Sequence, residues 1–266
     1  MTAEVHVPYD TQTGKCSPKV VKQKDTSTYL PRIVFKISVL EDFLEQPGCG
    51  GTRLIPSDHC STNHNQASTT MAAARSLLTG STPVKLEYFD IEGVAEQVRI
   101  ALAITSIPFD DARIPFAEWA AKKPTTKHGV LPEMTLPDGS VVTDSMAMLR
   151  LVGEADEEGK LYPSDVAKRL NIDQVLGLVG DLSRAWSPSV YLSMRPHLFG
   201  YPADWSGDEK EKVVKSVREA FMKNDFPRFM GHFEMLLKES GGGFLTGSDL
   251  TIADLSAFQQ VSFTLS

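Results

Sequence analysis

The residues best placed to do chemistry are a tyrosine at the end of an expected strand and an Asp-Ser pair before an expected helix. Alternating apolar residues predict a strand over 84–89, which places the Tyr88 hydroxyl near its carboxyl end. A helix over 93–105 should follow, and open α/β sheets usually hold ligands at such a place. Asp144 and Ser145 offer polar groups at a helix N-terminus, which favours anions. Each has a plain alternative, because strand tyrosines mostly pack and Asp-Ser is also a good helix cap.

Cysteine and histidine usage excludes several kinds of chemistry. The three cysteines, Cys16, Cys49 and Cys60, all precede Val84, so the chain from there on has no cysteine nucleophile and no cysteine-based metal site. Their scattered spacing predicts free thiols in a reducing compartment. The six histidines include no pair with helical ligand spacing, so we expect no metal site.

Charge and hydropathy narrow the possible partners. The net charge of −7 argues against nucleic acid or an anionic membrane as a partner. No apolar run approaches the ~20 residues that a membrane span requires. The N-terminus lacks the basic-then-apolar build of a secretion signal. We therefore expect a soluble, cytoplasmic protein.

The chain divides into three expected zones. Residues 1–83 are polar and Gly-rich, and we expect a disordered extension in which only 29–43 could form a strand or a short helix. Residues 84–153 alternate strand and helix patterns. Residues 154–266 begin with a charged linker and then show helical patterns only, which predicts an all-α domain.

Within the last two zones, the patterns predict individual elements. In the α/β zone they predict further strands over 109–114, 133–136 and 140–143, a loop through Pro124, a Pro-Asp-Gly turn and a helix from Ser145. In the all-α zone they predict helices over 165–186, 208–223 and 226–240, and a loop or broken helix with three prolines over 187–206. Thr251 and Asp254 form a capping box for a final helix.

Five short patterns, in order over about 180 residues, resemble the glutathione transferases, most closely the sigma class and its prostaglandin-D-synthase-like members. The family shows a Tyr-Phe strand end with a turn glycine and an Ala-Glu-x-x-Arg helix, a Trp-x-x-x-Lys, a Gly-x-hydrophobic-Pro, a polar residue before a serine-led helix, and a capping box. The matching residues are Tyr88-Phe89, Gly93 and Ala95 to Arg99, Trp119 and Lys123, Gly129 to Pro132, Asp144 to Arg150, and Thr251 to Asp254.

The resemblance implies a fold and an activity. The fold would be an α/β thioredoxin-like N-terminal domain followed by an all-α helical domain. The activity would be conjugation of the glutathione thiolate to hydrophobic electrophiles in detoxification, or a sigma-type isomerisation of a prostanoid-like endoperoxide. Glutathione would be the co-substrate, with no further cofactor and no metal, and the chain would form a homodimer.

The resemblance also assigns roles to residues. Tyr88 would donate its hydroxyl proton to the thiolate. The remaining contacts to glutathione would come from Asp144 and Ser145 for the γ-glutamyl end, Leu131 before a cis Pro132 for the cysteinyl part, Trp119 and Lys123 for the glycyl carboxylate, and Asp181 across a dimer interface. A packed Trp119, a solvated Lys123 and a solvated helix-face Asp181 are the competing interpretations. Trp186 and Tyr191 are candidates for the wall around the second substrate.

Two departures from the family pattern favour a second interpretation. Relatives often carry arginines beside the turn glycine, where this chain has Glu92 and Val94, and Asp90 adds another negative charge. The sequence also ends at Ser266, soon after the capped helix, which suggests a shortened C-terminal domain. The chain could therefore be a weakly active or non-catalytic binding or structural protein, similar to lens S-crystallins.

Overall fold

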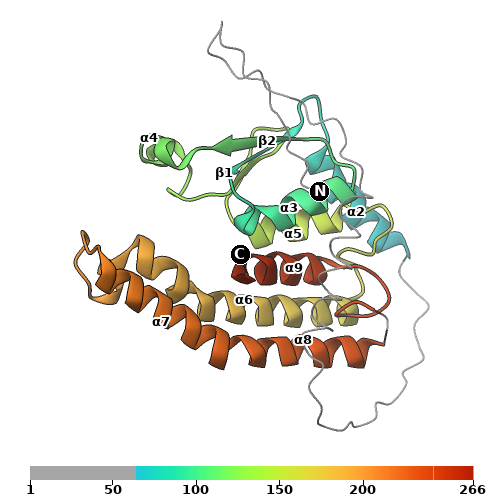
Figure 1. Ribbon diagram of the computed structural model, residues 1–266. Coiled ribbons are helices and arrows are strands. Elements are labelled where there is room, and N and C mark those ends of the chain that lie inside the picture. Colours follow the sequence, from blue (N-terminus) through green and yellow to red (C-terminus); the bar gives the residue numbers. More distant parts are fainter. Residues whose placement is uncertain (1–63, 242, 266) are drawn as a thin grey trace, which may run out of the picture.

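The computed structural model describes residues 64–241 and 243–265, which form a sheet and successive layers of helices (Figure 1). Two helices cover one face of a four-stranded sheet, and a third lies between them and the three long helices of the second domain. From the sheet outward the helices are α3 (Glu96–Ile104) and α5 (Ser145–Glu154), then α9 (Ile252–Leu265), then α6 (Val166–Met194), and last α7 (Asp208–Asn224) and α8 (Phe226–Ser240). This arrangement confirms the expected α/β domain followed by an all-α domain.

The sheet has the strand order β2-β1-β3-β4, and β1 is parallel to β2 but antiparallel to β3. The strands are β1 (Val84–Phe89), β2 (Phe109–Ile114), β3 (Glu133–Thr135) and β4 (Val141–Val142). The first two have the predicted bounds. The last two are slightly shorter than predicted, because the hairpin turn already begins at Leu136, whose N–H donates to the Ser140 carbonyl at 2.8 Å.

The inward face of β1 forms the centre of the α/β core. Val84, Leu86 and Tyr88 alternate along this face and are buried together with apolar residues of α3 and α5. The predicted helix after β1 is confirmed, although its first turn, η2 (Gly93–Ala95), has 3₁₀ geometry. The packed helices α3 and α5 therefore support Tyr88 on the inner side of the sheet.

The loop predicted through Pro124 contains three short helical turns. These are η3 (Phe116–Glu118), α4 (Trp119–Lys122) and η4 (Lys123–Thr125). Ala120 and Ala121 are good helix formers, and Pro124 lies at the first turn of η4, where a missing N–H costs nothing. The segment was too short to show a helical period.

Helix α2 (His64–Leu78) corrects the expectation of an unordered extension up to residue 83. Ala74 and Leu78 are buried in the core of the α/β domain. Arg75 donates from Nη1 to the carbonyls of Thr105 and Ala155, at the C-terminal ends of α3 and α5. The apolar pattern of α2 is weak, so its role is visible only from its packing against these helix ends. The predictions for residues 1–63, including the three cysteines, lie outside the described residues.

Removal of α2 should destabilise the protein. A chain that begins at Gly80 loses the buried Ala74 and Leu78 and the Arg75 contacts, which together contribute about 2–4 kcal/mol. A chain that begins at Met71 keeps all three residues and is the control. Thermal melting should show a drop of several degrees for the Gly80 start relative to the Met71 start; equal melting temperatures would contradict this role of α2.

Helix α6 continues to Met194, so the prediction of a loop or broken helix is wrong for residues 187–194. Pro188 lies inside the helix, where proline removes a backbone hydrogen bond and usually costs ~3 kcal/mol. The helix persists because Ser189 and Leu192 continue beyond the proline the buried stripe to which Trp186 belongs. The following turn, η5 (Pro196–Phe199), lies within the predicted loop.

The capping box before α9 is confirmed. The Asp254 carboxylate accepts from the backbone N–H and the hydroxyl of Thr251, both at 2.9 Å, and from the backbone N–H of Leu245 at 2.8 Å. The N–H of Ile252 donates to the Leu161 carbonyl at 2.9 Å. The box therefore joins α9 to the preceding loop and to the segment between the domains. Among the described helices, none is both long and apolar enough to cross a bilayer.

Candidate functional site

Tyr88 lies at the carboxyl end of β1 with its hydroxyl against the following turn. A Cβ added to Gly93 would lie 2.7 Å from the Tyr88 hydroxyl oxygen and 2.8 Å from the ring atom Cε1. Gly93 also has φ +44°, a conformation that favours glycine. Only a glycine fits in this turn without displacing the phenol, so the glycine of the sequence pattern has a physical reason.

The phenol is held in its neutral form. Burial raises the pKa of Tyr88, and this outweighs a backbone hydrogen bond from Val94, which lowers it; the field of Tyr191 raises it and that of Arg99 lowers it. A neutral phenol can donate its proton in a hydrogen bond to an anion. Tyr88 as a whole is only 9% exposed, so its ring belongs to the core of the α/β domain.

The start of α5 lies close to the turn that holds Tyr88. The Gln97 side-chain amide donates to the Val94 carbonyl at 3.2 Å and lies 3.7 Å from the sulfur of Met146, the second residue of α5. The structure thereby brings Ser145 and Tyr88 into one region. Sequence analysis missed Gln97, whose only signal is an amide at a buried position of an otherwise apolar helix face.

Asp144 and Ser145 begin α5 as predicted. Asp144 is the N-cap, and its Oδ1 accepts from the Ala147 N–H at 2.8 Å. Ser145 is the first helical residue and is half-buried. The capping interpretation of Asp144 thus holds, and Ser145 lies at the positive end of the helix dipole.

The Leu131–Pro132 peptide bond is cis, as the resemblance implied. Leu131 is half-buried and packs against the core, and the β3 ladder begins two residues later at Glu133. The backbone of Leu131 therefore lies just outside the sheet, beside the strand that carries Tyr88.

Trp119 and Lys123 lie on the short helical turns that follow β2. The Trp119 ring meets Phe89 edge-on at 5.4 Å, which supports the packing interpretation. Lys123 is exposed, and its side chain lies close to the backbone of Gly129, in the loop that leads to Leu131. Trp119 thus lies beside the last residue of β1 and Lys123 beside the loop that leads to β3, and no described contact joins either residue to Tyr88.

Two buried carboxylates anchor this segment to the sheet. Glu87 faces Glu133 in the register of β1 and β3, and the Lys127 N–H donates to Glu133 at 2.5 Å. The Lys122 ammonium lies 2.9 Å and that of Lys85 3.1 Å from the Glu87 carboxylate. Burial raises the pKa of Glu87, but the two lysines outweigh it and hold the pKa below its usual range. Glu87 is thus a buried carboxylate held ionised by its lysine partners.

Comparisons with known proteins agree with this geometry. Residues 201–266 match the family described as glutathione S-transferase, C-terminal domain. The chain is 31% identical to glutathione S-transferase 4 of Caenorhabditis elegans, over 64% of this chain and 75% of the relative. The chain belongs to the glutathione S-transferase family. It is also 29% identical to glutathione S-transferase 1 of Ascaris suum, over 64% of this chain and 75% of that protein.

Two solved structures have a similar fold. The structure of prostaglandin synthase D of Nilaparvata lugens superposes with a TM-score of 0.56 at 26% identity, covering 68% of this chain and 80% of that one. A Caenorhabditis elegans transferase superposes with a TM-score of 0.53 at 27% identity, covering 65% of this chain and 76% of the other.

The unusual acids of this transferase's turn differ in their surroundings. Asp90 forms an ion pair with Arg113 at 3.2 Å, so its charge is balanced locally. The Glu92 side chain is exposed, and its backbone carbonyl accepts from Arg99. Of the two carboxylates in this turn, that of Asp90 is therefore balanced by an arginine, while that of Glu92 extends into solvent.

Trp186 and Tyr191 were predicted to form the wall around the second substrate of this transferase. The prediction is wrong for Trp186, and for Tyr191 it stays a prediction. Trp186 is buried and packs on Phe221 at 5.0 Å, so it belongs to the helical core. Tyr191 is 39% exposed and close enough to affect the Tyr88 pKa. Their spacing on α6 puts them on different faces, which the sequence could not distinguish without knowing what covers the helix.

Asp181 is not part of the region around Tyr88. It lies on the exposed side of α6 in an ion pair with Arg184, ten residues and about 15 Å along the helix from Tyr191. Within one chain it is a solvated helix-face acid. Among the described residues, no group of three or more His, Cys, Asp or Glu side chains could hold a metal ion.

Proposed function

We propose that the protein conjugates glutathione to hydrophobic electrophiles, with Tyr88 as the residue that stabilises the thiolate. The observation that carries this proposal is the neutral Tyr88 hydroxyl, held at the strand end by Gly93. The protein's membership of the transferase family supports the same activity.

The chemistry depends on the ionisation of a thiol. A free thiol has a pKa of about 8.5, so only about 3% is thiolate at pH 7. The thiolate is the nucleophile, and a hydrogen bond from a neutral phenol stabilises it relative to the thiol. Lowering the thiol pKa by about two units corresponds to about 2.7 kcal/mol and makes thiolate the main species at pH 7. Tyr88 can supply such a bond from a buried position.

The remaining groups would bind the peptide part of glutathione. Ser145 would bind the γ-glutamyl carboxylate with its hydroxyl and N–H at the start of α5, and the free Asp144 oxygen would meet the ammonium. The Leu131 backbone would pair with the cysteinyl unit. Trp119 and Lys123 would contact the glycyl carboxylate. The reaction uses glutathione as co-substrate and needs no metal or further cofactor.

The second substrate would lie between Tyr88 and Tyr191, because Tyr191 of α6 is near enough to raise the pKa of Tyr88 and is itself partly exposed. The solved prostaglandin synthase D of Nilaparvata lugens, to which the fold is similar, makes isomerisation of an endoperoxide the alternative reaction at this site. Glu92 and Val94 favour a third role, that of a binding or structural protein with little turnover.

Three measurements separate these roles. Retention on immobilised glutathione tests binding, turnover of an aryl halide with glutathione tests conjugation, and turnover of an endoperoxide tests isomerisation. We expect the first two to be positive. Retention without turnover of either an aryl halide or an endoperoxide would support the binding protein, and failure to bind glutathione would rule out the proposal.

Ser145→Ala should weaken glutathione binding by ~1–3 kcal/mol, because a charge-assisted hydrogen bond to a carboxylate is lost. Calorimetry measures the dissociation constant. Ser164→Ala, in an exposed serine next to the start of α6, is the control and should bind glutathione normally. An unaltered dissociation constant for Ser145→Ala would leave Ser145 as a structural residue only.

The proposal extends to assembly and location. We propose a cytoplasmic homodimer in which Asp181 of one subunit reaches the glutathione ammonium of the other. Asp181 is exposed on α6 and far from Tyr88 of the same chain, so the site that it could reach is that of a second subunit. A monodisperse monomer in light scattering that binds glutathione at full strength would rule out the shared site.

A further inference from the structure

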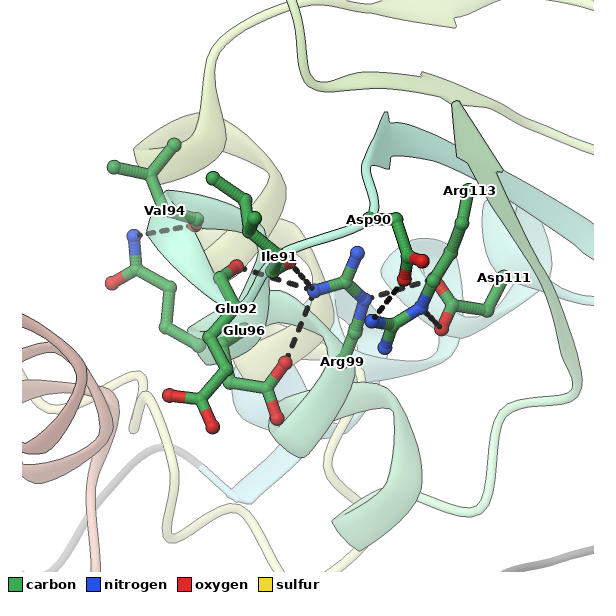
Figure 2. A network of polar contacts seen from close by, with 9 residues as sticks. Asp90, Ile91, Glu92, Val94, Glu96, Arg99, Asp111 and Arg113 are labelled. Carbon is green, nitrogen blue, oxygen red and sulfur yellow. Dashed lines mark hydrogen bonds and ion pairs between the residues drawn. The ribbon is translucent and has the colours of Figure 1, made fainter. Parts of the chain in front are cut away.

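Arg99 is a buried arginine that fastens the turn after β1. Its side chain is 4% exposed, and Nη1 donates to the carbonyls of Ile91 and Glu92 at 3.0 and 3.2 Å (Figure 2). The same atom lies 3.0 Å from Glu96 Oε2, and Nε donates to Asp111 Oδ1 on β2 at 2.8 Å. One planar group thus joins the turn, helix α3 and the neighbouring strand.

A second arginine completes the connection. Asp111 Oδ2 accepts from Arg113 Nε at 2.9 Å, and Arg113 Nη1 contacts Asp90 at 3.2 Å. The Asp90 N–H also donates to the Ile114 carbonyl at 3.3 Å. The turn is therefore tied to β2 at its start and to Arg99 at its next two residues, as Figure 2 shows.

The turn held by Arg99 is the one that contacts the Tyr88 hydroxyl. Ile91 and Glu92 directly precede Gly93, whose Cα packs on the phenol, and Val94, whose backbone bonds to it. The guanidinium carbon of Arg99 lies 5.9 Å from the centre of the Tyr88 ring. Its Nη2 atom is buried and has no hydrogen-bond partner among the described residues. The ring is therefore the neighbour that can offset the cost of burying this end of the guanidinium.

We propose that Arg99 is a positioning residue. Its guanidinium donates hydrogen bonds in several directions and holds the turn so that Gly93 and Val94 keep the Tyr88 hydroxyl directed at the glutathione sulfur. This inference rests on the proposed role of Tyr88. The arrangement of the guanidinium donors matters more for this role than the positive charge, because the carboxylates of Glu96 and Asp111 already balance the charge of Arg99. A lysine carries the same charge, but its single ammonium cannot contact both carbonyls and both carboxylates in this geometry.

The test compares Arg99→Lys with Arg169→Lys. Arg169 is a matched control, because its guanidinium also lies over a tyrosine ring, that of Tyr162 at 4.3 Å, with one carboxylate and one carbonyl partner. The measured quantity is the pKa of bound glutathione, from the ultraviolet absorbance of its thiolate across pH. We expect Arg99→Lys to raise it by about one unit, a tenfold loss of thiolate well below the pKa. Arg169→Lys should leave it unchanged.

A second measurement separates this inference from the role of Tyr88 itself. The ring carbon that carries the Tyr88 hydroxyl can be followed by NMR in protein without glutathione, with the signal assigned by Tyr88→Phe. We expect this signal to shift in Arg99→Lys and to stay in Arg169→Lys. A shifted signal with an unchanged thiol pKa would overturn the role of Tyr88, and an unchanged signal would overturn the positioning by Arg99.

Arg113→Gln keeps the test decisive if Arg99→Lys does not fold. Arg113 is 40% exposed, so its loss spares the core and loosens only the connection from Asp111 to Asp90. It should shift the Tyr88 signal and the thiol pKa in the same direction as Arg99→Lys, by a smaller amount. No change in either quantity would overturn the inference.

Discussion

Tyr88→Phe should lower kcat/KM for conjugation about 100-fold while glutathione binding changes only a few-fold. The substitution removes one hydrogen bond to the thiolate, and loss of a preorganised donor to a developing anion typically costs ~10²–10³ in rate. Binding depends mainly on the peptide contacts, which the phenylalanine leaves in place. Steady-state kinetics with an aryl halide and calorimetry with glutathione measure the two effects.

Tyr162→Phe is the matched control for this experiment. Its hydroxyl donates to Asp173 at 3.0 Å in another part of the molecule, so its loss should affect stability and leave turnover unchanged.

Wild-type activity should rise with pH through the thiol pKa. It should not fall through loss of the Tyr88 proton until above about pH 10, because burial raises the Tyr88 pKa above its ordinary value. Full turnover in Tyr88→Phe would point to a different activating group.

Asp254→Ala should be the most destabilising of the substitutions considered, by about 3 kcal/mol or more. The alanine leaves the buried N–H groups of Leu245 and Thr251 without their acceptor, and each such group costs ~1–3 kcal/mol. For a protein of this size the melting temperature should fall by about 6–12 °C. Thermal unfolding followed by circular dichroism measures the shift.

Asp165→Ala provides the comparison. Asp165 caps α6 through the Lys168 N–H at 2.9 Å, but this cap is exposed, and its loss should cost only about 1 kcal/mol. Equal shifts in the two variants would show that the Asp254 box is an ordinary surface cap and that the burial of its donors is unimportant.

Local patterns were sufficient for the elements that their own residues define. Alternation identified β1, an Asp-Ser cap identified the first residue of α5, and the capping box of Thr251 and Asp254 identified the start of α9. Each signal concerns residues within one or two turns of each other, where hydrogen bonding and side-chain period are decided locally. The same short patterns correctly indicated the transferase family and the cis bond before Pro132.

Tertiary packing decided the features whose partners lie far away in the sequence. Helix α6 continues through Pro188 because burial of its stripe outweighs the lost hydrogen bond, and α2 is part of the fold because Arg75 meets two distant helix ends. Packing also placed Trp186 in the core and Tyr191 near Tyr88. No period or cap encodes such contacts.

The site shows the same division between sequence and structure. From the sequence alone, Tyr88, Gly93 and Arg99 were three matching letters of a pattern, and only the tyrosine had a chemical role. Their physical relation, a glycine under the hydroxyl and a guanidinium bound to the carbonyls of the turn, exists only once β1, α3 and β2 are packed together. The sequence determined which groups this protein can use for chemistry, and the tertiary structure decided how they are held, because burial, electrostatic fields and close contacts arise from neighbours that the chain brings together only on folding.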